Sequence, residues 1–117
     1  MWTRDEFRAV VPGGVIGMIH LQSLPGSPRW GGDLGAVRAA ALDDAAALAA
    51  AGFGAVMVEN YHDVPFHPDR VPAPTVAALA VVVAAIRDGQ PGLAVGVNVL
   101  RNDVAAALAV AAATGAR

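Results

Sequence analysis

The sequence has 117 residues, a length that allows one domain with a buried core. Hydrophobic residues make up 56% of the chain and charged residues 15%, which excludes an intrinsically disordered protein. The net charge of −2 offers no basic face to nucleic acid, and the absence of cysteine excludes disulfides and thiolate metal sites.

No stretch of the sequence is apolar for long enough to cross a bilayer, because Asp, Arg and Pro interrupt every candidate. The first residues, Met1 to Glu6, are too polar for a secretory signal. We therefore expect no integral membrane segment, and a cytoplasmic location is the default expectation.

Residues 1–14 are predicted to form a leader ahead of the first strand. Residues 3–10 can form one short amphipathic helix, with Phe7 and Val10 on the side that covers the bottom of a sheet. The run Pro12-Gly13-Gly14 then interrupts regular structure.

Three segments share one pattern, in which a nearly continuous apolar run ends on polar residues and a loop follows. The runs are residues 15–20, 55–60 and 93–99. The interval from His20 to Glu59 equals the interval from Glu59 to Asn98, at roughly forty residues, and such a period indicates a repeated supersecondary unit. Continuous apolar runs are typical of parallel strands that are covered on both faces.

A helix is predicted after each strand. The helices cover residues 34–51, the segment from Pro74 to about Asp88, and residues 103–114 or nearly so. Asp33 and Asn102 are the predicted N-caps of the first and third helices. Gly52 and Gly115 stand where a C-terminal glycine ends a helix. The successive βα units are then residues 15–52, 53–89 and 90–117.

The order of elements predicts an α/β fold with parallel strands and right-handed crossovers. Alternation puts small or flexible side chains, and then a polar one, on one face of each strand, while β-branched side chains occupy the other. A closed barrel needs that asymmetry and an open doubly wound sheet does not. We therefore predict the N-terminal three βα units of a TIM (βα)8 barrel, a partial domain over residues 1–117, since a complete barrel needs about 250 residues. Its open edges predict self-association.

Four motifs carry a resemblance to a known family. They are Val15-Ile16-Gly17-Met18-Ile19-His20-Leu21, Leu24-Pro25-Gly26-Ser27-Pro28, Glu59-Asn60, and Gly96-Val97-Asn98-Val99-Leu100-Arg101-Asn102-Asp103. Together, in this order and spacing, they resemble the BtpA family, also called BtpA/SgcQ. The resemblance implies a TIM barrel of the phosphate-binding type and a role in photosystem I biogenesis, through accumulation of the reaction centre. It implies a peripheral position at the thylakoid membrane only where that role applies.

His20, Glu59 and Asn98 are the candidate catalytic residues. In a barrel, the C-terminal ends of the strands face the mouth of the active site. A histidine beside a carboxylate can act as a general acid or base, or join a metal site, and an asparagine can orient a substrate. The alternative is that His20 is an interior histidine with satisfied hydrogen bonds and that the other two cap loops.

Four further residues are candidates for binding a small anionic or sugar-like ligand: Arg29, Trp30, Asn60 and Arg101. Arg29 and Trp30 lie in a loop that can close over a ligand as a lid, and Trp30 can equally pack onto the top of the sheet. Arg101 can bind phosphate or carboxylate, or form a surface salt bridge.

Asn60, His62, Asp63 and His67 crowd the loop after the second strand, but their spacing matches no recognised metal site. We interpret this loop as solvated, predict no metal ligands, and leave the cofactor unknown. Three hypotheses for function remain: a BtpA-family role in photosystem I biogenesis; a TIM-barrel hydrolase, lyase or isomerase acting on a small phosphorylated or sugar-like substrate; and a fragment without function. Fold alone does not separate them, so whether the protein is an enzyme stays open.

Overall fold

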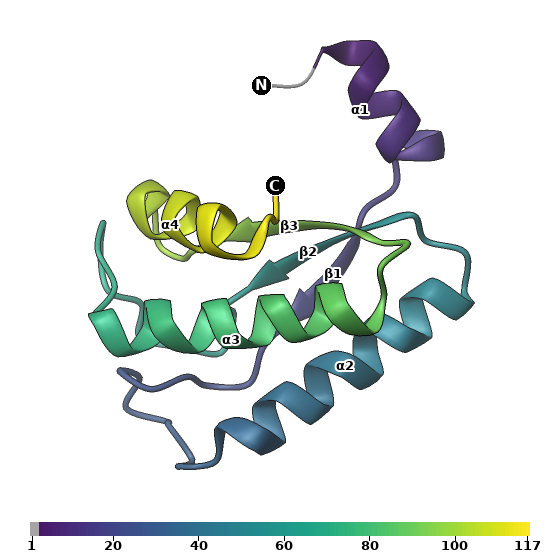
Figure 1. Ribbon diagram of the computed structural model, residues 1–117. Helices are drawn as coiled ribbons and strands as arrows, with labels where there is room; N and C mark the ends of the chain where they lie inside the picture. Colours follow the sequence, from purple (N-terminus) through teal and green to yellow (C-terminus); the bar gives the residue numbers. More distant parts are fainter. Residues whose placement is uncertain (1–2) are drawn as a thin grey trace.

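The computed structural model describes residues 3–117, so the first two residues of the predicted leader lie outside it. The elements are α1 (Arg4–Val10), the 3₁₀ turn η1 (Pro12–Gly14), β1 (Gly17–His20), α2 (Leu34–Ala50), β2 (Ala55–Glu59), α3 (Ala73–Gly89), β3 (Ala94–Asn98) and α4 (Val104–Thr114). Three successive βα units follow the leader, as the sequence predicted (Figure 1).

The three strands form one parallel sheet in the order β1-β2-β3. The register pairs His20 with Glu59 across β1 and β2, and Glu59 with Asn98 across β2 and β3. The three residues that are equally spaced in the sequence are therefore direct neighbours across the sheet. A slip of one residue would turn these side chains to the opposite face, so the register decides whether they meet.

Helices α2, α3 and α4 pack on one face of the sheet (Figure 1). The core between them and the strands contains Ile19, Val58 and Val95 from the sheet, and α3 contributes Val82 and Ile86. All five side chains are at most 2% exposed. The prediction that the β-branched face packs against helices is confirmed for the residues within the strands, but Val15 lies before β1 and is 59% exposed.

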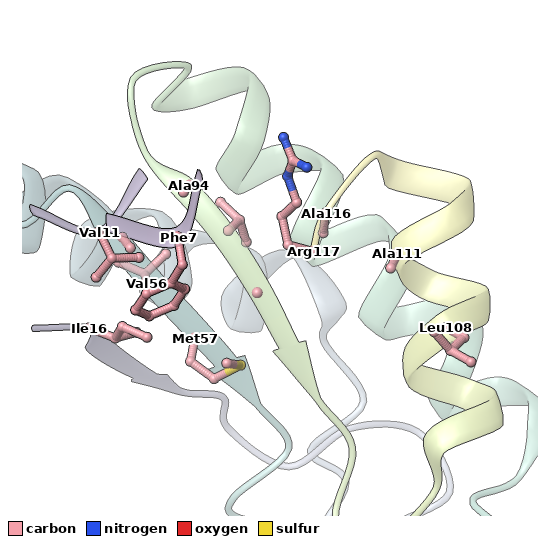
Figure 2. A pocket seen from close by; sticks show the side chains of 13 residues that line it. Phe7, Val11, Ile16, Val56, Met57, Ala94, Leu108, Ala111, Ala116 and Arg117 are labelled. Carbon is pink, nitrogen blue, oxygen red and sulfur yellow. The ribbon is translucent and has the colours of Figure 1, made fainter. Parts of the chain in front are cut away.

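The opposite face of the sheet carries small and flexible side chains and has none of these three helices over it. Met18 is 45% exposed there. Phe7 and Val11 reach the N-terminal part of this face from the leader, and an open groove of about 600 Å³ runs past Met57 toward Leu108 of α4 (Figure 2).

The ends of helices α2 and α4 can be compared with the caps that the sequence predicted. Gly52 has a φ of 95°, and the N–H of Phe53 donates to the C=O of Leu48 over 3.1 Å, which is the hydrogen bond of a Schellman motif. Gly115 ends α4 with a φ of 75°, as predicted. The prediction of Asn102 as N-cap is wrong, because Asp103 holds that position and accepts a hydrogen bond from the N–H of Ala106.

Arg117 lies against the edge of β3. Its N–H donates to the C=O of Val95 over 2.7 Å, and its C=O accepts from the N–H of Val97 over 3.1 Å. Two bonds that bracket Gly96 in this way are the pattern of a parallel strand pair. Within residues 3–117, no helix is both long and apolar enough to cross a membrane.

Candidate functional site

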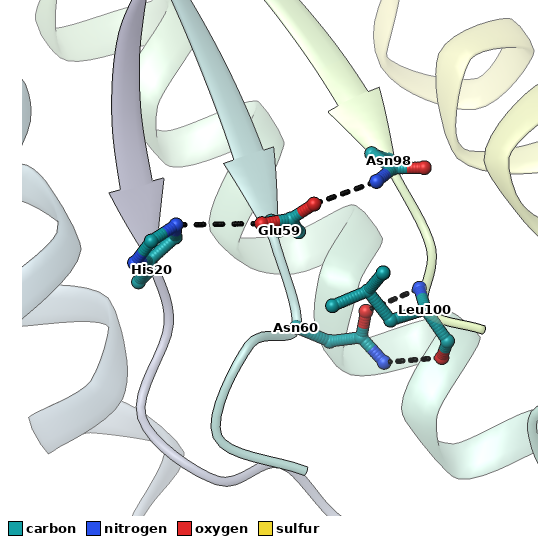
Figure 3. Close-up of polar contacts among 5 residues, drawn as sticks. All are labelled: His20, Glu59, Asn60, Asn98 and Leu100. Atoms are coloured by element: carbon teal, nitrogen blue, oxygen red, sulfur yellow. Dashed lines mark hydrogen bonds and ion pairs between the residues drawn. The ribbon is translucent and has the colours of Figure 1, made fainter. Parts of the chain in front are cut away.

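The strand register brings the three candidate catalytic side chains into one row at the C-terminal ends of the strands (Figure 3). His20 Nε2 lies 3.3 Å from Glu59 Oε2, and Asn98 Nδ2 donates to Glu59 Oε1 over 2.6 Å. Both carboxylate oxygens are therefore engaged by neighbours. The side chain of His20 is 39% exposed and that of Glu59 13%, so the row opens to solvent at its ends and is covered at its centre.

This arrangement has defined chemical possibilities. The imidazole of His20 can accept or release a proton beside a carboxylate that the amide of Asn98 holds in place. The row also presents hydrogen-bond donors and acceptors side by side, which suits a ligand that carries hydroxyl or acidic groups.

Tyr61 is a member of the site that the sequence analysis missed. Its ring stacks on the imidazole of His20, with centroids 4.1 Å apart and planes inclined by 10°. The edge of His62 meets the same tyrosine at a centroid distance of 5.3 Å. Tyr61 is 47% exposed and is the only tyrosine in the sequence, and its position two residues after Glu59 is the one signal that pointed to it.

Asn60 points away from the row and is only 1% exposed. Its Nδ2 donates to the C=O of Leu100 over 2.9 Å, and its Oδ1 accepts from the N–H of Leu100 over 2.7 Å. The side-chain amide therefore binds the backbone of the loop after β3 (Figure 3). A role for Asn60 in contacting a ligand stays a prediction, and the geometry gives it a structural role.

The interpretation of the loop after β2 as solvated is wrong for Asn60 and for Asp63, which are 1% and 6% exposed. Asp63 Oδ1 accepts from the N–H of Leu24 over 2.7 Å, and Asn60 Nδ2 lies 3.5 Å from Asp63 Oδ2. Burial raises the pKa of the Asp63 carboxyl, and the hydrogen bonds from Leu24 and Asn60 oppose that rise. His62 and His67 are exposed, in line with the prediction. A run of polar residues does not reveal which of them turns inward.

The remaining candidates lie on loops around the row. Arg29 is exposed, and Trp30 is half-buried and packs against the core. A lid role for the two side chains stays a prediction. Both line a cleft of about 310 Å³ with Gln22 and Ser23. Arg101 is exposed, and its backbone N–H donates to the C=O of His67 over 3.4 Å. Whether these three side chains bind a ligand stays a prediction.

In the part of the chain that the structure describes, no three His, Asp or Glu side chains converge closely enough to hold a metal ion. Every buried side-chain nitrogen and oxygen in that part has a hydrogen-bond partner. The buried polar side chains of the loops therefore find their partners within the protein, whereas His20 and Asn98 keep exposed polar atoms.

Comparison with known proteins points to one family. A model described as the BtpA family matches residues 12–117. The chain is 46% identical over 103 residues to the Photosystem I biogenesis protein BtpA of Synechocystis sp., covering 88% of this chain and 36% of that protein. An uncharacterized protein of Thermococcus kodakarensis is 56% identical over 102 residues, which are 87% of this chain and 38% of the relative.

An uncharacterized protein of Archaeoglobus fulgidus is 48% identical over 103 residues, covering 87% of this chain and 40% of the relative. The chain thus spans between 36% and 40% of the length of these three relatives. No solved structure shows a significant match.

Proposed function

The chain belongs to the BtpA family, and we propose that it supplies the first three βα units of a TIM barrel whose mouth binds a small anionic or sugar-like ligand. One observation carries the ligand site: His20, Glu59 and Asn98, from three register-paired strand ends, form an unbroken chain of polar contacts. In a barrel, these ends line the mouth.

Three features support the barrel. Helices α2 to α4 share one face of the sheet, which is the arrangement of a barrel wall. The opposite face carries Ala55, Ala94 and Gly96, small residues that suit a narrow interior. Arg117 occupies the position of a next parallel strand at the edge of β3, so the sheet is open to continuation there.

Binding is the activity that we propose for the row. Glu59 offers an acceptor while His20 and Asn98 offer donors, a combination that matches vicinal hydroxyl groups or an acid beside a hydroxyl. The comparisons give no support to the enzyme alternative. The catalytic roles of His20, Glu59 and Asn98 stay predictions.

For the role in the cell, we propose the one for which the Synechocystis relative is named, photosystem I biogenesis. The support is 46% identity over 88% of this chain. A position at the surface of the thylakoid membrane follows from that role.

A chimera tests both parts of the proposal. In it, residues 12–117 of this chain replace the matching segment of the Synechocystis protein. Produced in Synechocystis cells that lack their own copy, the chimera should restore photosystem I, measured as photo-oxidisable P700. His20→Ala and Glu59→Gln should each abolish the restoration, because the first removes one member of the row and the second removes the negative charge that both neighbours contact. Arg38→Ala, on the exposed face of α2, is the matched control and should restore it fully.

Ligand binding is tested with the purified chimera. We expect ribose 5-phosphate, ribose or inorganic phosphate to shift the ring signals of His20 in NMR spectra, and Glu59→Gln to remove that shift. If none of the three probes moves the ring signals, the ligand site is wrong. If Glu59→Gln and His20→Ala leave photosystem I unchanged, the row does not serve the cellular role.

A further inference from the structure

Three loops meet at the C-terminal ends of the strands, and one buried pair of side chains joins them. The loops are residues 21–33 after β1, 60–72 after β2 and 99–103 after β3. The pair consists of Asn60 and Asp63, which are 1% and 6% exposed. Both lie in the middle loop, and each contacts the backbone of a different neighbouring loop.

The contacts form a continuous path through the three loops. The path runs from the N–H of Leu24 to Asp63 over 2.7 Å, from Asp63 to Asn60 over 3.5 Å, and from Asn60 to both backbone groups of Leu100 over 2.7 and 2.9 Å. Leu24 is 39 positions before Asp63, and Asn60 is 40 positions before Leu100. The first and last links therefore each join one βα unit to the next, and the Asp63–Asn60 contact connects them within the middle loop.

We propose that Asn60 and Asp63 are positioning residues, a buried clamp that fixes the three loops and thereby sets the geometry of the His20–Glu59–Asn98 row. Asn60 sits between Glu59 of the row and Tyr61, whose ring stacks on His20. Holding the side chain of Asn60 against Leu100 fixes the direction of the chain on both sides of it. The consequence for ligand binding rests on the function proposed above.

The clamp depends on the chemistry of its members as well as on their volume. Leu100 presents one donor and one acceptor, and an amide side chain answers both at once, which an ionised carboxylate does not. In Asn60→Asp, a carboxylate oxygen would face the C=O of Leu100. In Asp63→Asn, an NH₂ group would face the NH₂ group of Asn60. Each change keeps the shape of the side chain and breaks one link of the path.

The test uses the folded chimera and the ring signals of His20. Tyr61 stacks on that ring, so removing the stack in Tyr61→Leu should shift the signals through loss of the ring current. Asp63→Asn and Asn60→Asp should shift them in the same direction. Ser23→Ala is the matched control. It removes a 2.8 Å hydrogen bond from Ser23 Oγ to the C=O of His62, which joins the loops after β1 and β2 at the surface. This variant should leave the signals in place.

Ligand affinity is the second measurement. Asp63→Asn should weaken the binding of ribose 5-phosphate by about tenfold, and Ser23→Ala by less than about twofold. If the unaltered chimera binds no ribose 5-phosphate, the proposed ligand fails while the ring signals still decide the clamp. Folded Asn60 and Asp63 variants whose ring signals match those of Ser23→Ala would overturn the proposal.

Hydrogen exchange in the unaltered chimera provides a measurement that needs no variant. The amide protons of Leu24 and Leu100 should exchange slowly, because buried side chains accept both. If the clamp variants do not fold, this exchange decides: slow exchange at both sites supports the clamp, and exchange at the rate of an open loop overturns it.

Discussion

At the scale of single residues, the start of α4 shows a carboxylate that accepts one backbone hydrogen bond with each of its two oxygens. A side-chain amide has one acceptor oxygen and does not accept both. Asp103 is 4% exposed and accepts two backbone donors, the N–H of Ala106 over 2.9 Å and the N–H of Val71 over 2.7 Å. The first bond caps α4 and the second ties the loop after β2 to it. Both bonds lower the pKa of Asp103, and the bond from Ala106 has the larger effect. Asn102 instead takes a φ of 66° in the turn before the cap.

We expect Asp103→Asn to destabilise the chimera by about 1–3 kcal/mol at neutral pH, because an amide has one acceptor and would leave the N–H of Val71 unpaired. The folded pKa lies below the ordinary aspartate value of about 3.9, so the stabilisation is complete above that value and is lost as the pH falls through the folded pKa. Thermal unfolding followed by circular dichroism should therefore show the gap between the two proteins closing in acid. A gap that is independent of pH would contradict this account.

At the scale of elements, the loop after β1 is built against the first turn of α3. Thr75 Oγ1 donates to the C=O of Pro25 over 2.6 Å, and the next residue, Gly26, has a φ of 97°. A Cβ atom on Gly26 would lie 2.5 Å from Thr75 Oγ1 and 2.6 Å from Pro72 Cγ. The loop therefore needs a glycine for its backbone angle and for its close approach to the helix.

Gly26→Ala and Gly52→Ala form a matched pair that separates these two requirements. Gly52 has a φ of 95° but open space around its missing Cβ, so alanine there should cost only the left-handed strain of about 1–2 kcal/mol. Gly26→Ala should cost more, because Thr75 and Pro72 must also move. Urea denaturation of the two variants in the chimera measures the difference. Equal losses of unfolding free energy would mean that the loop does not pack on α3 as described.

At the scale of the whole molecule, the sheet has one helix-covered face and one open face. Met18 is 45% exposed on the open face. Leu108 of α4, at the groove along this face, is 66% exposed. Within residues 3–117, no strand pairs with the outer edge of β1, and Arg117 hydrogen-bonds to the edge of β3. Open edges and uncovered apolar surface favour association between chains.

We expect the 117-residue chain, produced by itself, to self-associate, and light scattering over a range of concentrations should show this directly. Met18→Lys places a charge on the open face, which should reduce association without disturbing the buried core on the other side. Arg38→Ala, on the exposed face of α2, is the control and should associate like the unaltered chain. A monodisperse monomer that unfolds cooperatively would refute the expectation.

The order of elements, the parallel pairing and the row of His20, Glu59 and Asn98 were all predictable from the sequence. The reason is that equal spacing between apolar runs becomes a sheet register when every connection is a helix of similar length. The glycine-terminated ends of α2 and α4 were predictable as well, because a left-handed residue at a helix end is a local requirement.

Contacts between loops were not predictable in the same way. The burial of Asp63, the stack of Tyr61 on His20 and the choice of Asp103 over Asn102 as the cap each depend on a partner from another part of the chain. Leu24 is 39 positions from Asp63 and Val71 is 32 positions from Asp103, so no local pattern signals these hydrogen bonds. They form because the folded sheet brings three strand ends together, and a polar side chain that becomes buried there must then find its partner in a neighbouring loop.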